Sequence, residues 1–61
     1  MRRRDLLRHL ARHGCEMLRE GRRHTVYVNR QARTVSTIPR HREIKEVLVK
    51  EICQDLEIPE P

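Results

Sequence analysis

Aromatic side chains are nearly absent from this 61-residue chain, which contains Tyr27 but neither tryptophan nor phenylalanine. Only 36% of its residues are hydrophobic, whereas 38% are charged. Such a composition is typical of disordered chains unless the apolar residues recur at regular spacing. A chain of this length buries only about 60% of the surface that it exposes when unfolded, so its stability is marginal. The length leaves room for one domain, residues 1–61, and no more.

Cysteine is also scarce. Cys15 and Cys53 are too few for a disulfide framework or a cysteine-based zinc site. Both have apolar neighbours, which predicts small buried thiols and a reducing compartment, the cytoplasm. No apolar run is long enough to span a bilayer, so we expect no membrane contact. The acidic residues are scattered, and we predict neither a metal site nor a cofactor.

Acidic residues are fewer than basic ones. The chain contains nine Asp and Glu residues and 14 Lys and Arg residues, which gives a net charge of +5. Twelve of the basic residues are arginine, whose planar guanidinium matches phosphate and stays charged. An arginine-rich surface favours a polyanionic partner, and nucleic acid is the commonest one. The alternative is a generally basic surface, or arginine usage that follows a GC-rich genome.

A first helix is predicted between Asp5, a suitable N-cap, and Gly14, which can adopt the left-handed conformation that ends a helix. Its apolar stripe is Leu6, Leu7, Leu10 and Ala11. Residues 1–4, which include three arginines, are predicted to be a frayed basic arm that is free to bind phosphates. The segment also resembles a mitochondrial presequence, but the chain would keep too little core without it.

A second helix is predicted near the C-terminus, because apolar residues repeat at every fourth position. This stripe consists of Ile44, Leu48, Ile52 and Leu56, with Val47 filling it. We expect His41 in the first turn of this helix. Pro59 ends the helix and begins a short tail, residues 59–61.

Three strands are predicted between the helices, at 15–20, 24–29 and 33–38. Residues 29–33 form a hairpin turn, and Pro39 closes the third strand. Core positions are expected at Leu18, Val26 and Val28, and Tyr27 is expected to be half-buried. The order helix, three strands, helix predicts an α+β fold, a two-layer sandwich with both helices on one face of an antiparallel sheet. The other face is left open to a ligand.

Three segments of the chain together resemble the HicA-type mRNA interferase toxins, small proteins with a fold like the double-stranded-RNA-binding domain. These segments are "LLRHLARHGCEMLRE", "EGRRHTVYVN" and "IPRHREIKEVLVKEICQDLEI". The resemblance covers Asp5 to Ile58. It implies the toxin of a type II toxin–antitoxin system, an endoribonuclease that cleaves mRNA and inhibits translation. It also implies a HicB-type antitoxin that covers the active surface until it is degraded.

The active histidine of this family follows a Gly-Gly-Ser or Gly-Ser stretch at the head of the second strand, and His24 occupies that place. The small residues are replaced here by Arg22 and Arg23, which substitute side-chain charge for close approach of the backbone. Phosphate affinity is expected to rise and the cleavage geometry to change. Cys15 also replaces the aromatic residue that often follows the glycine of the first helix.

The chemistry of RNA cleavage suits these residue types. RNA carries its own nucleophile, the 2′-hydroxyl, so cleavage needs a proton acceptor, a proton donor and positive charge near the developing phosphorane. An imidazole transfers protons well near neutral pH, which predicts His24 as general base or general acid and His41 as the nearest candidate for the complementary role. The cations predicted to bind RNA phosphates are Arg22, Arg23, Arg40, His41, Arg42 and Lys45.

Plainer interpretations stay open at this stage. A lone histidine at the start of a strand is more often an ordinary exposed residue than a catalyst, and a basic turn can lack a ligand. His9 and His13 on the first helix are interpreted as solvated.

Two other functions also stay open. The first is a non-catalytic RNA-binding module that recognises shape and charge, which Arg22 and Arg23 favour. The second is a small interaction protein with an acidic protein partner. RNA affinity that falls steeply with salt would exclude the second, and new RNA ends would single out the enzyme.

Overall fold

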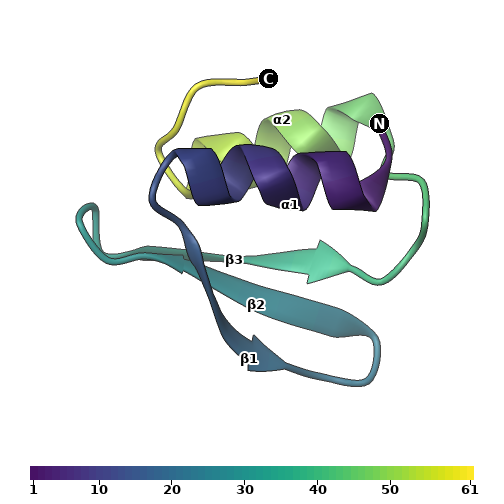
Figure 1. Cartoon of the computed structure of the whole chain (residues 1–61), viewed down its shortest axis with the longest axis horizontal. Helices are drawn as coiled ribbons and strands as arrows, with labels where there is room; N and C mark the ends of the chain where they lie inside the picture. Colours follow the sequence, from purple (N-terminus) through teal and green to yellow (C-terminus); the bar gives the residue numbers. More distant parts are fainter.

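The structure, a computed structural model, describes all 61 residues. Its elements are α1 (Arg3–Arg12), β1 (Glu16–Glu20), β2 (His24–Asn29), β3 (Thr34–Pro39) and α2 (Glu46–Asp55). The strands form one antiparallel sheet in the order β1-β2-β3. Both helices lie on the same side of this sheet, and its other face is uncovered (Figure 1). The predicted two-layer α+β fold is therefore confirmed. No helix has both the length and the apolar character needed to cross a bilayer.

The core lies between the helices and β3. Ile38 is the central sheet residue in it, fully buried against both helices. The other buried members of the cluster are Leu6, Leu10, Cys15, Ile44, Val49, Ile52, Cys53 and Leu56. Tyr27 is half-buried against this cluster, as predicted. The two cysteines are buried free thiols, also as predicted.

The register of the sheet separates two faces. Thr25 pairs with Ile38, and Tyr27 pairs with Ser36, so these residues share the helix-covered face. Val26 pairs with Thr37, and that pair lies on the open face. Val28 lies on the same open face as Val26, because side chains alternate along a strand. Val28 is nevertheless buried, and Val26 is half-buried.

Leu18 was predicted in the core, and that prediction is wrong. The register of β1 shifts between Met17 and Arg19, which leaves Leu18 without a partner on β2. β1 is also an edge strand that the helices do not cover, and all five of its residues are exposed. Leu18 keeps 50% of its surface in solvent as a result.

The buried face of α2 differs from the predicted stripe. Val47 is 60% exposed, and Leu48 is only half-buried, because the packed face consists of Val49, Ile52, Cys53 and Leu56. An α-helix turns by about 100° per residue, so Val47 lies roughly 200° around the axis from Val49. Ile44, Ile52 and Leu56 of the predicted stripe are buried, whereas Val47 falls on the solvent side. Ala11 of α1 is likewise exposed.

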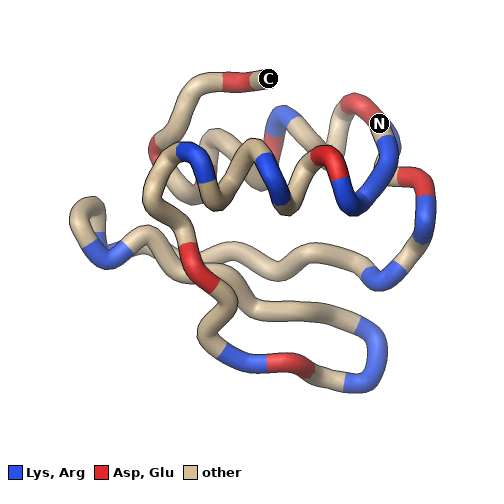
Figure 2. Tube along the Cα trace, viewed as in Figure 1, with Lys and Arg blue, Asp and Glu red and all other residues tan.

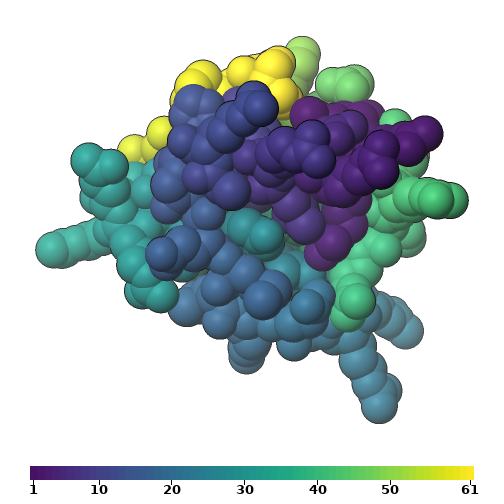
Figure 3. All heavy atoms as spheres, viewed as in Figure 1, coloured from purple at the N-terminus to yellow at the C-terminus, as the bar shows by residue number.

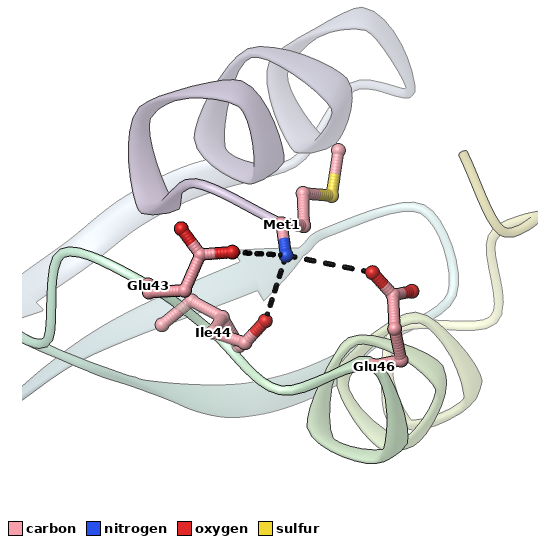
Figure 4. A network of polar contacts seen from close by, with 4 residues as sticks. All are labelled: Met1, Glu43, Ile44 and Glu46. Atoms are coloured by element: carbon pink, nitrogen blue, oxygen red, sulfur yellow. Dashed lines mark hydrogen bonds and ion pairs between the residues drawn. The ribbon is translucent and has the colours of Figure 1, made fainter.

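The N-terminal residues form no arm, contrary to the prediction. Arg3 and Arg4 belong to α1, and its N-cap is Arg2 rather than Asp5. The backbone N–H of Arg3 donates to the Arg42 carbonyl at 2.8 Å, so the loop before α2 satisfies a donor that a capping side chain usually satisfies. The Met1 ammonium lies between Glu43 (2.8 Å) and Glu46 (3.4 Å) and also donates to the Ile44 carbonyl at 3.0 Å (Figure 4).

The same contacts keep the β3–α2 loop extended. The backbone N–H of Ile44 donates to the Met1 carbonyl at 2.7 Å, and Arg2 and Glu43 form an isolated β-bridge. α2 therefore begins only at Glu46, and His41 lies in the loop rather than in the first helical turn as predicted.

Candidate active site

His24 is the first residue of β2, and it pairs with Pro39 at the end of β3. It is exposed, and its ring makes no hydrogen bond or ion pair within the chain. The β1–β2 turn and the β3–α2 loop both begin at this end of the sheet. Figure 2 shows arginines of the turn, of the loop and of the N-terminus at the same end of the molecule.

His24 borders a hollow of about 450 Å³, which we call the histidine hollow. Its lining residues are Arg23, His24, Pro39, Arg40 and His41. Two imidazoles and two guanidiniums thus surround one space that is open to solvent, and no carboxylate belongs to its lining.

A second hollow, of about 290 Å³, adjoins the first and shares His24, Pro39 and His41 with it. Its far wall is α2, which contributes the carboxylates of Glu51 and Asp55. The hydroxyl of Ser36 donates to Asp55 at 3.0 Å and fixes that carboxylate against the sheet. The two histidines therefore lie between a cationic side and an acidic side.

A chain of polar contacts connects α1 to the cationic side of the site. The Arg3 guanidinium donates to the Thr25 hydroxyl at 2.7 Å, and that hydroxyl donates to the Glu20 carboxylate at 2.9 Å. Glu20 in turn forms an ion pair with Arg40 at 3.4 Å. Thr25 is only 1% exposed, so a buried hydroxyl joins α1 to the two segments that flank His24.

Arg40 also holds the β1–β2 turn. Its backbone N–H donates to the Arg23 carbonyl at 3.2 Å, and its guanidinium donates to the Gly21 carbonyl at 3.3 Å. The turn closes with the Gly21 N–H donating to the His24 carbonyl at 2.8 Å. A Cβ at position 21 would lie 2.9 Å from that carbonyl oxygen. A glycine is therefore needed three residues before the histidine, which fixes the entry of His24 into β2.

The structure brings together some of the predicted site residues. Arg23, Arg40 and His41 border the histidine hollow with His24. The other three do not border it. Arg22 is exposed on the turn, Arg42 lines a different hollow with Arg2, Arg3 and Arg4, and Lys45 lines another with His41 and Glu43. Arg40 is paired with Glu20, so part of its charge is already compensated.

Sequence reasoning missed the supporting residues. Arg3 bonds to partners 22 and 36 positions away, Thr25 and Pro39, and no local pattern indicates such a contact. Glu51 and Asp55 carried a usable signal, because residues four apart share a helix face. His9 is not simply solvated either, since its ring lies 2.6 Å from the Pro59 carbonyl.

The two cysteines take no part in this chemistry. Burial raises the pKa of the Cys15 and Cys53 thiols, so both stay protonated near neutral pH and are poor nucleophiles. The ionisable groups that remain at the sheet end are the imidazoles, guanidiniums and carboxylates described above. They can transfer protons and stabilise an anion.

The amino-acid sequence also matches a known protein family. Residues 3–58 match the family model described as the HicA toxin of bacterial toxin–antitoxin systems. The chain therefore belongs to the HicA toxin family, whose fold is like the double-stranded-RNA-binding domain, and it is the toxin of a toxin–antitoxin pair. Comparisons with curated proteins and with solved structures gave no match.

Proposed function

We propose that this HicA-family toxin is an endoribonuclease that cleaves mRNA without a metal ion and thereby inhibits translation. The observation that carries the proposal is the histidine hollow, in which His24 and His41 share one solvent-open space with Arg23 and Arg40. The proposed catalytic residue is His24, and the proposed phosphate ligands nearest to it are Arg23 and Arg40.

The proposed reaction uses the nucleophile that RNA supplies. The ribose 2′-oxygen attacks the adjacent phosphorus while one imidazole accepts its proton, and the P–O5′ bond breaks as the second group protonates the leaving oxygen. The products are a 2′,3′-cyclic phosphate and a 5′-hydroxyl. Guanidiniums beside the phosphorane stabilise the added negative charge. The groups proposed for these two proton transfers are His24 and His41, because both line the histidine hollow.

The proposed partner is a HicB-type antitoxin that covers the histidine hollow. An acidic protein surface complements a basic end of the toxin, and occluding His24 would silence the enzyme without unfolding it. The expected result is that added antitoxin abolishes cleavage by the folded toxin.

Inducible expression tests the proposal. Wild type should arrest growth and deplete intact messages, whereas His24→Ala should do neither. His13→Ala is the matched control, because His13 is an exposed histidine at the end of α1 and borders neither hollow at His24. Growth arrest by His24→Ala at the wild-type level would contradict the proposed role.

A second function has a specific observation in its favour. Arg22 and Arg23 stand where the family has small residues, and the Arg40 guanidinium is held by Glu20. Both features suit retention of RNA more than turnover. A non-catalytic RNA-binding module would bind RNA with steep salt dependence and generate no new ends, with or without His24.

A further inference from the structure

A second cationic hollow lies beside the first and has no role in the proposed reaction. It measures about 310 Å³, and we call it the arginine hollow. Its lining residues are Arg2, Arg3, Arg4, Leu7 and Arg42. Four of the five are arginines and none is acidic. They come from two segments far apart in the sequence, because the N-terminal residues pack against the loop before α2, as the space-filling view shows in purple and green (Figure 3).

The charges of this hollow are poorly compensated inside the protein. The side chains of Arg2 and Arg42 form no hydrogen bond or ion pair. Arg4 has only a long contact of 3.9 Å with Asp5. The Glu43 carboxylate binds the Met1 ammonium at 2.8 Å, which is the main cause of its lowered pKa, and the charge of Arg2 makes a smaller contribution to that shift. Guanidiniums therefore gather where α1 begins, next to the positive end of its dipole, and an anion would relieve their repulsion.

Arg3 differs from the other three. Its Nε donates to the Pro39 carbonyl at 3.0 Å, and its Nη2 donates to Thr25. The Arg3 guanidinium is therefore held by bonds within the protein and is a fixed part of the lining of the hollow. Arg2, Arg4 and Arg42 are exposed and can turn toward a ligand.

Consecutive residues of the β3–α2 loop line the two cationic hollows. Arg40 and His41 line the histidine hollow, and Arg42 lines the arginine hollow. The Cα atoms of Arg40 and Arg42 are separated by at most about 7 Å of chain. Arg3 links the same two spaces, because it borders one and bonds to Pro39, which borders the other. A single polyanion can therefore occupy both.

We propose that Arg2, Arg4 and Arg42 form a phosphate-binding subsite for the RNA strand, which holds a backbone phosphate next to the one at His24. This inference rests on RNA being the substrate, as proposed above. The guanidinium fork suits bidentate contact with phosphate oxygens, and the contact is independent of sequence. The subsite fixes the position of the strand and takes no part in proton transfer.

The test measures RNA binding rather than cleavage. A fluorescently labelled single-stranded RNA of 12 nucleotides is titrated with full-length His24→Ala protein at several salt concentrations. The subsite variant adds Arg2→Gln, Arg4→Gln and Arg42→Gln. The matched control adds Arg8→Gln, Arg33→Gln and Lys50→Gln, which remove the same charge from exposed residues outside both cationic hollows.

Each phosphate contact with single-stranded nucleic acid contributes about −0.7 to the slope of log K against log salt. The subsite variant loses one phosphate contact, so it should lose about 0.7 from this slope and bind on the order of fivefold more weakly at 0.1 M salt. The matched control should lose less than half as much. Replacement of the same three arginines by lysine should retain most of the slope and lose part of the affinity, because the charge stays and the fork is lost.

Equal weakening by the two glutamine triples would overturn the proposal, since net charge alone would then explain it. Loss of antitoxin binding with unchanged RNA binding would also overturn it and assign the hollow to the protein partner. Circular dichroism shows whether the glutamine variant of the subsite is folded. If it is unfolded, the salt slope and RNA affinity of the lysine variant test the proposal instead. The outcome is separate from that of the proposed function, because the titration needs no cleavage, and cleavage by His24→Ala would refute only the catalytic role.

Discussion

The two ends of the sheet use similar side chains for different purposes. At the turn between β2 and β3, Asn29 donates to the Leu56 carbonyl at 2.7 Å and accepts from the Ala32 N–H, and Arg30 pairs with Glu16 at 2.9 Å. Each of these polar groups satisfies another group of the protein. At the His24 end, two imidazoles and several guanidiniums face solvent-open hollows instead.

This difference teaches where to expect function in a small basic protein. Arginine is present at both ends, so composition does not separate them. The two ends differ in the number of cationic side chains that have no partner within the protein. We expect changes at the turn end to lower stability and leave activity unchanged. We expect changes to the exposed groups at the His24 end to lower activity and leave stability unchanged.

His41 gives the largest expected effect. Replacement by alanine removes the proposed partner of His24 in proton transfer, and general acid–base catalysis typically contributes about 10²–10⁴-fold. We expect kcat for a short RNA to fall by at least about 100-fold, with the denaturation midpoint unchanged because His41 is exposed in a loop. The double variant with His24→Ala should be little worse than either single variant. Undiminished cleavage by His41→Ala would assign the second proton transfer to another group.

Asn29→Ala should give the opposite result. It leaves the buried Leu56 carbonyl without its donor, and an unsatisfied buried group costs about 1–3 kcal/mol. Urea denaturation should show this loss, while RNA cleavage below the unfolding transition stays at the wild-type rate. A matched loss of cleavage would mean that the two ends are coupled.

Thr25→Val tests the link between stability and the site. Valine keeps the shape of threonine but removes the hydroxyl that joins Arg3 to Glu20. We expect a loss of about 1–3 kcal/mol and a several-fold fall in cleavage, since Glu20 no longer has a fixed position from which to hold Arg40. Thr25→Ser keeps the hydroxyl and should keep most of the activity.

The smallest expected effect concerns pH. The hydrogen bond from Met1 to Glu43 raises the pKa of the amine above its usual 8.0 and lowers the pKa of Glu43 below its usual 4.5. The contact therefore stabilises the fold fully between about pH 4.5 and 8.0. The contribution disappears as the pH rises through the raised pKa of the amine, and as it falls through the lowered pKa of Glu43. Thermal melts of Glu43→Gln should show weaker pH dependence on both sides.

The fold could be predicted largely from sequence, because its signals are local. The β-branched run of β2 begins at His24 and ends at Asn29 in both the prediction and the structure. The predictions for Val47 and Leu18 were wrong for two reasons. The exposure of Val47 depends on which face of α2 packs against the core, and that of Leu18 on a shift in strand register, and neither is visible in the sequence.

The site could be predicted only in part. His24 and its neighbour Arg23 lie in one segment, so family resemblance could indicate them together. The fixed position of Arg40 depends on Glu20 and Thr25. Arg42 lies beside the N-terminal arginines because its carbonyl accepts a hydrogen bond from the Arg3 backbone N–H. These contacts join segments that are far apart in the chain, and no spacing rule encodes them.

The central claim is that His24 transfers a proton during RNA cleavage, and product analysis tests it most directly. Purified wild type and His13→Ala should convert a defined RNA into fragments with a 2′,3′-cyclic phosphate and a 5′-hydroxyl at similar rates. His24→Ala should form these fragments at least about 100-fold more slowly. Cleavage by His24→Ala at the wild-type rate, with the same ends, would contradict the account.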